Sequence, residues 1–267
     1  MDSGLAGQGI LVTGASGGIG TATARRLAAE GARLVLHYHR NRAAAEALAT
    51  ELGPEHLALG ADLRDEAQAE ALFAQALAQL PRLDGLVVNA GIWPAADEPL
   101  HRMSMARWQD TLAADLTSAF LCCRAFLRHL AEVPRREAAI VLIGSTAALF
   151  GEAGHADYAA AKAGLAYGLT RTLKNEIAGL APRGRVNCIC PGWVNTRMAA
   201  GAADDPAVIG RVTATMALRK IARPEDVAAS IAFLLSDRLA GHLSGTILPL
   251  AGGMEGRLLW PEGPYAS

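Results

Sequence analysis

The sequence predicts an α/β protein, a doubly wound three-layer fold in which helices cover both faces of a roughly seven-stranded parallel sheet. Three observations predict it. Short apolar runs alternate with Ala- and Leu-rich stretches of helical length along the whole chain. A helical stretch separates most strands from the next, which favours parallel pairing through right-handed crossovers. Several strands are nearly continuous apolar runs, as expected for strands covered on both faces.

The expected strands are short, apolar and followed by turn residues: Ile10–Val12, Arg33–Tyr38, Leu57–Ala61, Gly85–Val88, Ala139–Ile143, Arg185–Ile189 and Thr246–Pro249. The expected helices carry apolar residues at helical spacing: Ile19–Glu30, Arg42–Leu52, Arg64–Leu80, Met103–Leu130, Ala156–Leu180 and Glu225–Leu235. The chain contains no internal repeat and no low-complexity linker. We therefore expect a single domain over residues 1–267.

Composition excludes several classes of function. A net charge of -1 over 267 residues gives no basic face for nucleic acid or an anionic membrane. No stretch approaches the roughly 18 apolar residues of a membrane span, and the first residues do not read as a signal peptide. The cysteines form two close pairs without zinc-ligand spacing, Cys122 with Cys123 and Cys188 with Cys190. We expect free thiols, no metal site and a cytoplasmic protein.

Two segments depart from the regular alternation of strands and helices. Residues 196–220 are rich in Ala and Gly, and residues 254–267 follow the last expected strand. Ligands of open α/β sheets bind beyond the carboxyl ends of the strands, and both segments follow such an end. We expect residues 196–220 to form a substrate lid. The tail over 254–267 is either a second wall of the ligand site or a frayed terminus.

A glycine-rich turn follows the first strand, with the sequence Thr13-Gly14-Ala15-Ser16-Gly17-Gly18-Ile19-Gly20. Glycines at 14, 18 and 20 let the backbone turn tightly and approach a pyrophosphate without clashes of Cβ atoms. The helix that follows offers free N–H groups and the positive end of its dipole. The spacing differs from the usual G-x-G-x-x-G fingerprint, so the turn alone does not identify a dinucleotide site.

The turn is the first of six motifs, and the others are Asp62-Leu63, Asn89-Ala90-Gly91, Ser145, Tyr158-x-x-x-Lys162 and Pro191-Gly192. In content and order these motifs resemble the short-chain dehydrogenase/reductase family, over residues 8–253. The resemblance implies a Rossmann fold, a nicotinamide coenzyme, and a homotetramer or homodimer built on the helices Met103–Leu130 and Ala156–Leu180. It also implies a set of coenzyme-binding residues: Gly14, Ser16, Gly17, Gly18, Ile19, Gly20, Asp62, Leu63, Asn89, Ala90, Gly91, Tyr158, Lys162, Pro191, Gly192, Val194 and Thr196.

Tyr158 and Lys162 are one helical turn apart and share a helix face. Lowering the pKa of a tyrosine by about three units takes roughly 4 kcal/mol. One ammonium about 4 Å away, at an effective dielectric near 20, supplies on the order of 4 kcal/mol. We therefore expect Lys162 to lower the pKa of Tyr158, with help from the oxidised nicotinamide. The resemblance implies that Tyr158 is the catalytic acid/base, that Lys162 also binds the nicotinamide ribose, and that Ser145 bonds the substrate oxygen.

Asp115 departs from the family pattern. Relatives usually have asparagine there, holding a water in a proton relay to the lysine. A carboxylate accepts hydrogen bonds but does not donate them, and it can pair with Lys162 and weaken the effect of that lysine on Tyr158. We include Asp115 among the catalytic residues and expect retained activity with an altered pH profile.

The end of the second strand favours NADP(H) over NAD(H). Tyr38 stands where NAD-preferring relatives usually carry an acid, and it is followed by His39-Arg40-Asn41-Arg42. Guanidinium groups suit a 2′-phosphate through bidentate hydrogen bonds. We assign His39, Arg40 and Asn41 to the coenzyme, and this segment resembles the one in pteridine reductases. The alternative is that the arginines merely open the next helix, and Gly17 stands where many NADP-dependent relatives place a basic residue.

The predicted function is hydride transfer between nicotinamide and a carbonyl or alcohol carbon of a small molecule, in the direction of NADPH-dependent ketone reduction. Three alternatives stay open. Reduction of a C=N bond in a pterin or imine is supported by the second strand but opposed by Ser145. Reduction of a ketoacyl group on an acyl carrier fits the body of the chain, which resembles those reductases, but no clear basic docking patch supports it. A non-catalytic dinucleotide-binding protein is motivated only by Asp115.

Overall fold

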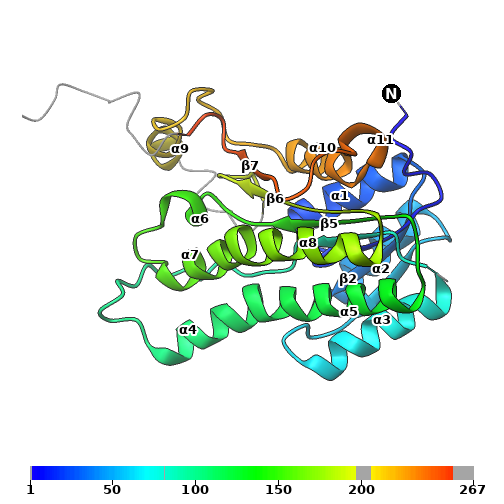
Figure 1. Cartoon of the computed structure of the whole chain (residues 1–267). Helices are drawn as coiled ribbons and strands as arrows, with labels where there is room; N and C mark the ends of the chain where they lie inside the picture. The colour runs from blue at the N-terminus through cyan, green and yellow to red at the C-terminus, as the bar shows by residue number, and fades with distance from the viewer. Residues whose placement is uncertain (1, 81, 197–205, 255–267) are drawn as a thin grey trace, which may run out of the picture.

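The computed structural model describes residues 2–80, 82–196 and 206–254. These residues form one parallel sheet of seven strands in the order β3-β2-β1-β4-β5-β6-β7, with helices on both faces (Figure 1). The chain winds from β1 out to β3, then returns to β4 beside β1 and continues to β7. The predicted fold class is confirmed. The reversal between β1 and β4 marks the place where ligands of such sheets bind.

All seven predicted strands are present: β1 Gly9–Val12, β2 Arg33–Tyr38, β3 Leu57–Gly60, β4 Gly85–Val88, β5 Glu137–Ile143, β6 Arg183–Pro191 and β7 Ile247–Leu250. The largest differences from prediction are at β5 and β6, which begin earlier, at Glu137 and Arg183. Both strands begin with a charged residue, so the apolar pattern did not show where they begin. The extra length carries charged side chains to the amino edge of the sheet.

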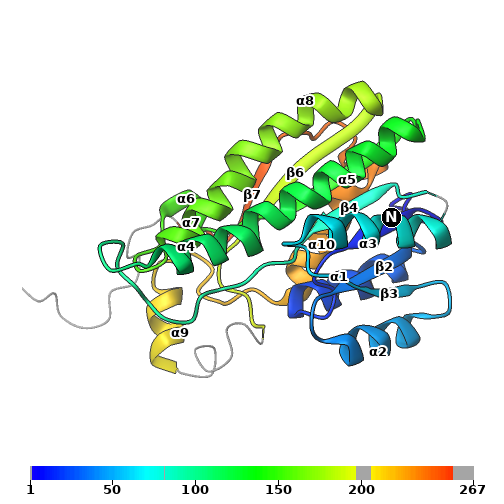
Figure 2. The ribbon, with the colours of Figure 1, turned by 90° about the horizontal axis from the view of Figure 1, so that it is seen from below.

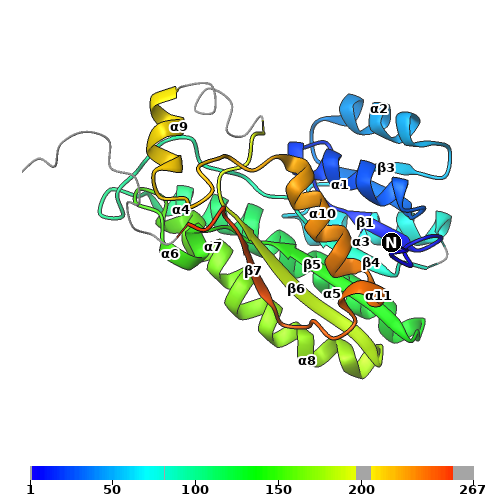
Figure 3. The ribbon, with the colours of Figure 1, turned by 90° about the horizontal axis from the view of Figure 1, so that it is seen from above.

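Each face of the sheet buries a separate hydrophobic core. On one face, α1 (Gly18–Ala29), α2 (Arg42–Leu52) and α10 (Pro224–Leu235) pack on the sheet, as Figure 3 shows. On the other, α3 (Glu66–Gln79), α5 (Ser118–Glu132) and α8 (Thr170–Leu180) pack on the sheet, as Figure 2 shows. Phe126 of α5 and Ile177 of α8 are fully buried in this second core. Such double coverage explains the apolar strands.

The two long predicted helices are each interrupted by a π-helical turn. The first runs as α4 (Met105–Leu112), η1 (Ala113–Thr117) and α5, and the second as α7 (Ala156–Ala163), η2 (Gly164–Leu169) and α8. The apolar spacing predicted continuous helices and gave no sign of these turns. The turns contact each other, because a Cβ on Gly164 would lie 3.0 Å from Leu116. Such turns are common at functional sites, and η1 carries Asp115.

Within the segment expected to form a lid, the structure describes Thr196 and residues 206–220, where α9 spans Pro206–Thr213. The remaining lid residues and tail residues 255–267 lie outside the described residues. The short helices α6 (Ala147–Phe150) and α11 (Asp237–Ala240) complete the structure. None of the helices in the described residues has the length and apolarity needed to cross a bilayer.

Candidate functional site

The glycine-rich turn between β1 and α1 forms a cradle that leaves no room for side chains. Gly14 has a φ of 66°, in the left-handed region. A Cβ on Gly20 would lie 2.2 Å from the carbonyl oxygen of Gly14. Helix α1 begins at Gly18 with Gly17 as its N-cap and without a side-chain cap. Backbone N–H groups at this end can therefore bind the pyrophosphate of a dinucleotide.

The carboxyl end of β4 braces this cradle. The side-chain amide of Asn89 donates to the carbonyl oxygens of Thr13, at 2.9 Å, and Gly14, at 3.2 Å. The Thr13 hydroxyl accepts the backbone N–H groups of Asn89 and Ala90. Gly91 follows, and a Cβ there would lie 2.4 Å from Asp115. The structure thus brings the Asn-Ala-Gly motif against both the cradle and the catalytic residues.

His37 locks the turn onto the second strand, a role the sequence argument missed. Its Nδ1 accepts the N–H of Gly14 at 3.1 Å, and its Nε2 lies 3.0 Å from the carbonyl oxygen of Ala61. These bonds require the neutral ring, with the proton on Nε2. Burial lowers the pKa of His37 to about 4. The only signal in the sequence was a histidine within an otherwise apolar strand.

The polar residues after β2 and β3 lie where a coenzyme ribose and adenine would extend. Asp62 accepts a bidentate ion pair from Arg64, with the closest contact at 2.6 Å. This pair is the main cause that lowers the pKa of Asp62 to about 2. His39 lies 3.6 Å from Asp62, and Leu63 is buried. Arg64 is a further basic residue at this position that the sequence argument did not assign.

The three residues that follow His39 have different surroundings. Arg40 is exposed, and no side-chain partner is recorded for it within residues 2–80, 82–196 and 206–254. The side chain of Asn41 caps α2 by accepting the N–H of Ala44, and Arg42 pairs with Glu46. The sequence left two alternatives for the arginines, binding a 2′-phosphate or opening the next helix. Arg42 serves the helix, whereas Arg40 is available to a ligand.

The carboxyl end of β6 closes the cradle from the opposite side. Pro191 ends the strand and Gly192 follows it. Val194 is buried and pairs with Ala222 in an isolated bridge. Thr196 reaches the glycine turn, since a Cβ on Gly18 would lie 2.7 Å from its methyl group. Within the turn, Ser16 and Ile19 are half-buried.

Ser145, Tyr158 and Lys162 meet at the carboxyl edge of the sheet. Ser145 follows β5, and its oxygen accepts the N–H of Ala147 at 3.1 Å. The Lys162 ammonium lies 5.5 Å from the centre of the Tyr158 ring. It donates to the carbonyl oxygen of Ile143 at 3.3 Å. Lys162 is buried, whereas Tyr158 is half-buried and can be reached by a substrate.

The pKa of Tyr158 differs from the sequence expectation. Burial raises it above its ordinary value, and this effect outweighs the lowering by Lys162 and by a hydrogen bond with Ser145. Asp115 contributes a further increase. Lys162 thus lowers the pKa of Tyr158, as expected, but the sequence argument did not include the larger and opposite effect of desolvating the phenolate.

Asp115 lies in η1 and is fully buried. Its Oδ1 accepts the N–H of Ile92 at 2.7 Å and lies 3.9 Å from the Lys162 ammonium. Its Oδ2 is buried and makes no hydrogen bond within the described residues. Burial raises the pKa of Asp115, while Lys162 and the Ile92 N–H oppose the increase. Burial lowers the pKa of Lys162, but Asp115 and Tyr158 together raise it by more.

Aromatic side chains form a wall beside Tyr158. The Trp93 ring stacks on His155 at 3.9 Å between ring centres and meets the edge of the Tyr158 ring at 4.8 Å. The Nε2 of His155 lies 2.8 Å from the carbonyl oxygen of Pro94, which fixes the ring against this loop. Trp93 therefore lies directly against the ring of Tyr158. His155 supports it from behind.

A buried ion pair ties this wall to α7, and no pattern in the sequence indicated it. Arg107 of α4 donates through Nε to Asp157 at 3.0 Å. The same guanidinium donates to the carbonyl oxygens of Ala96 and Gly154. Asp157 precedes Tyr158, is fully buried and also accepts the hydroxyl of Thr111 at 2.8 Å. One cation thus holds together the loop after β4 and the start of α7.

The described residues contain no group of three or more His, Cys, Asp or Glu side chains arranged to hold a metal. Their four cysteines are free and buried, as predicted. The cradle, the phenol and the ammonium together fit a nicotinamide dinucleotide, since a close backbone cradle for phosphates lies beside a proton donor and a cation.

Comparison with known proteins supports this reading. A family model described as enoyl-(acyl carrier protein) reductase matches residues 14–255. The chain is 36% identical over 254 residues to a 3-oxoacyl-(acyl-carrier-protein) reductase of Synechocystis sp., covering 94% of this chain and 98% of the relative. It is 40% identical over 258 residues to a cis-4-hydroxycyclohexanecarboxylate dehydrogenase of Sinomonas cyclohexanicum, covering 95% and 98%. It is 36% identical over 254 residues to 3beta-hydroxysteroid dehydrogenase 1 of Eggerthella lenta, covering 94% of each chain.

The Rossmann sheet and these relatives together show that the protein is a nicotinamide-dependent oxidoreductase that acts on a carbonyl or alcohol carbon of a small molecule. The chain belongs to the short-chain dehydrogenase/reductase family. The family resemblance and the class of reaction predicted from the sequence are confirmed. The roles of the individual residues remain predictions.

Proposed function

We propose that the protein reduces a ketone of a small molecule with NADPH, and that Tyr158 is the acid that protonates the substrate oxygen. One observation carries the proposal: Ser145, Tyr158 and Lys162 lie together beside the glycine cradle, at the carboxyl edge of the sheet. A carbonyl oxygen between the two hydroxyl groups would accept a hydrogen bond from each. The Trp93 wall would cover one side of the substrate.

The chain's own residues account for binding and proton transfer. The bound coenzyme supplies the hydride. The Ser145 oxygen accepts the N–H of Ala147. The Ser145 hydroxyl donates to the carbonyl oxygen and orients it. Tyr158 donates its proton to the same oxygen as negative charge develops there. The ammonium of Lys162 then stabilises the phenolate that remains.

The raised pKa of Tyr158 suits the proposed role of this residue as an acid in ketone reduction. An acid must hold its proton before it can donate it, and burial raises the pKa of Tyr158. At neutral pH the phenol is therefore protonated, which suits reduction of a ketone. Oxidation of an alcohol needs the phenolate instead and would be favoured at higher pH, where more of Tyr158 is ionised.

The preference for NADPH is supported by the charges near the end of β2. Arg40 is exposed and available to a 2′-phosphate. The carboxylate of Asp62 is paired with Arg64, so its repulsion of a phosphate is reduced. We expect Arg40→Gln to raise the KM for NADPH at least tenfold and to leave the KM for NADH little changed. Tighter binding of NADH by the parent protein would reject NADPH as the coenzyme.

Loss of NADPH absorbance with a panel of substrates tests the reaction. The panel contains three ketones, namely a 3-oxoacyl thioester, a substituted cyclohexanone and a 3-ketosteroid. It also contains one C=N substrate, a dihydropterin. Tyr158→Phe should lower kcat by roughly a factor of 1000 and leave NADPH binding intact. Turnover of Tyr158→Phe at the parent rate would reject Tyr158 as the acid. Activity with the dihydropterin alone would replace ketone reduction by C=N reduction, and inertness to the whole panel would favour a non-catalytic protein.

We also propose a cytoplasmic homo-oligomer, a tetramer or a dimer, that contacts itself through α4–α5 and α7–α8. Phe120 and Tyr167 expose 44% and 48% of their surface on these helices. Four free thiols suit a reducing compartment. Light scattering during gel filtration measures the oligomer. We expect Phe120→Asp to shift it towards monomer, and an unchanged mass would exclude this face from the contact.

A further inference from the structure

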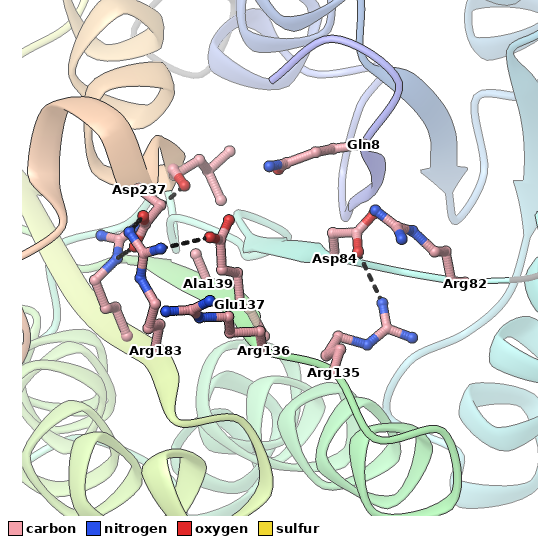
Figure 4. Close-up of a pocket in the computed structure, with 12 residues that line it drawn as sticks. Gln8, Arg82, Asp84, Arg135, Arg136, Glu137, Ala139, Arg183 and Asp237 are labelled. Carbon is pink, nitrogen blue, oxygen red and sulfur yellow. Dashed lines mark hydrogen bonds and ion pairs between the residues drawn. The ribbon is translucent and has the colours of Figure 1, made fainter. Parts of the chain in front are cut away.

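A second polar cavity lies at the edge of the sheet opposite the coenzyme cradle (Figure 4). It has a volume of about 190 Å³, and its lining includes residues at or before the amino ends of β1, β4, β5 and β6. Five of its lining residues are arginines: Arg82, Arg135, Arg136, Arg183 and Arg185. Nothing in the proposed reaction uses this cavity, because the substrate and the coenzyme bind at the other edge.

One end of the cavity is built around a single carboxylate. Asp84 pairs with Arg82 at 3.1 Å and with Arg135 at 2.9 Å, and it also accepts the N–H of Gly9. In Figure 4 these groups stand at one end, and the side chain of Gln8 reaches towards the cavity above them. Two guanidinium groups share one carboxylate here. This end therefore keeps an excess of one positive charge.

The other end has the opposite balance. Glu137 pairs with Arg183 at 2.8 Å, and Asp237 pairs with the same arginine. Asp237 also lies 3.8 Å from Arg185. Two carboxylates and two guanidinium groups cancel at this end. Arg136 lies between the two ends in Figure 4 and adds one more positive charge. The five arginines and three acids of the lining therefore sum to a charge of +2.

Several polar atoms of the lining lack hydrogen bonds. The Nε of Arg135 is buried without a hydrogen-bond partner in the described residues, and the Nε of Arg185 and Oδ1 of Asp237, which also lack hydrogen bonds there, face each other at 3.8 Å. The side chain of Arg185 is only 4% exposed. Buried donors and acceptors of this kind are costly unless a ligand or water satisfies them. The site therefore combines uncancelled positive charge with one buried donor, the Nε of Arg135, that lacks a partner.

Two of the arginines are free to move onto a ligand. No side-chain partner of Arg136 is recorded in the described ranges. Arg82 bonds Asp84 through Nε alone, and its side chain is 61% exposed. Backbone carbonyl groups hold two of the others, Arg135 by Leu83 and Arg185 by residues of α10 and α11. Arg183 is held by the carboxylates of Glu137 and Asp237. Arg82 and Arg136 can thus be replaced without removing these bonds.

We propose that this cavity binds a phosphate dianion, either free phosphate or the phosphate group of a monoester. A dianion balances the charge of +2, and its several oxygen atoms match the fork of donors on each guanidinium. Arg82 and Arg136 close on the ligand from the exposed side. The site is separate from the coenzyme phosphates, because the length of the strands lies between the two edges of the sheet.

Titration calorimetry with inorganic phosphate tests the site, using protein saturated with NADP⁺ and sodium chloride of matched ionic strength as the blank. The parent protein should bind phosphate above the blank. The double variant Arg82→Gln/Arg136→Gln should bind it at least tenfold more weakly. The control Arg33→Gln/Arg171→Gln makes the same change in net charge at exposed positions outside the cavity, and it should bind as the parent does. Glycerol 1-phosphate in a parallel titration distinguishes a monoester from free phosphate.

Three results would overturn the proposal. The parent protein binds neither phosphate nor glycerol phosphate above the chloride blank. Both double variants lose affinity equally, which would indicate a general effect of net charge. Phosphate binds to the coenzyme-free parent but not to the parent saturated with NADP⁺, which would place the phosphate in the coenzyme cradle instead.

Discussion

Asp115 and Lys162 face each other in the buried centre of the site, with 3.9 Å between Oδ1 and Nζ. The acid stands where the family usually has an amide. Its charge raises the pKa of Lys162 and adds to the increase in the pKa of Tyr158. The effect of a charged group at this position therefore extends to the phenol that we propose as the acid.

Asp115→Asn should shift the pH dependence of the reaction. Removing the carboxylate removes one cause that raises the pKa of Tyr158, so that pKa falls. Alcohol oxidation needs the phenolate, and its rate should rise at a lower pH than in the parent. Reduction needs the phenol, and its decline at high pH should shift in the same direction. The measurement is kcat/KM against pH in both directions, and superimposable curves for parent and variant would remove Asp115 from the proton pathway.

His37 should make the protein sensitive to acid. Its pKa is lowered from an ordinary 6.5 to about 4 in the folded protein. The unfolded chain therefore binds more protons between these values, and the stabilisation is complete above pH 6.5 and is lost as the pH falls towards 4. The loss is on the order of 3 kcal/mol. Urea unfolding at intervals across this range measures it.

The matched variant for that experiment is His37→Gln. Glutamine does not titrate, so the variant should be less stable at pH 7 and should show a smaller slope of stability between pH 6.5 and 4. Equal slopes in the parent and His37→Gln would show that other groups cause the acid sensitivity.

The sequence was sufficient for the fold and for the residues at the carboxyl edge. Parallel strands bring their carboxyl ends together, so motifs that follow β1, β4, β5 and β6 must converge once the strands are recognised. Asn89, Ser145 and Tyr158 could be placed in this way. The π-helical turn around Asp115 could not, because it replaces one helical hydrogen-bond pattern by another without changing the apolar spacing.

Other features depend on packing that no local pattern encodes. The raised pKa of Tyr158 is caused first by burial, which depends on the helices and loops around the ring. Arg107 and Asp157 are separated by 50 positions along the chain. The arginines of the second cavity come from segments spread between Arg82 and Arg185. In the sequence, nothing distinguishes Arg107, Asp157 or these arginines from ordinary surface charges.

Gly20→Ala should abolish coenzyme binding. A Cβ at this position would lie 2.2 Å from the carbonyl oxygen of Gly14, and backbone cannot yield as a flexible side chain does. Relief requires the cradle to open, which displaces the N–H groups meant for the pyrophosphate. We expect the Kd for NADPH, measured by its fluorescence, to rise at least about 100-fold, equivalent to roughly 3 kcal/mol.

Gly179→Ala is the control for the glycine cradle. Gly179 lies in α8 with open space around a new Cβ. Alanine within a helix is more stable than glycine by about 0.5–1 kcal/mol, so this variant should melt slightly higher and bind NADPH normally. Circular dichroism of both variants separates lost binding from lost folding. Normal NADPH affinity in a folded Gly20→Ala protein would exclude the cradle as the phosphate site.

The pair formed by Arg107 and Asp157 should matter for stability and for the substrate wall. Asp157 is fully buried, and the Arg107 side chain is 14% exposed. Arg107→Met leaves the buried carboxylate of Asp157 without its cation, a situation that typically costs about 3–5 kcal/mol. For a chain of this size we expect the melting temperature to fall by roughly 10 °C. Arg102→Met, at an exposed position shortly before α4, should melt as the parent does.

A double variant separates the effect of the unpaired buried charge from the effect of the lost hydrogen bonds to the loop. Arg107→Met/Asp157→Asn carries no unpaired buried charge, and it should recover part of the stability lost by Arg107→Met alone. The loop that carries Trp93 would still lack the bonds from Arg107 to Ala96 and Gly154. The KM for a ketone should therefore stay raised in the double variant while the melting temperature recovers. If the double variant melts as low as Arg107→Met, the loss comes from the missing bonds to the loop and not from the buried charge.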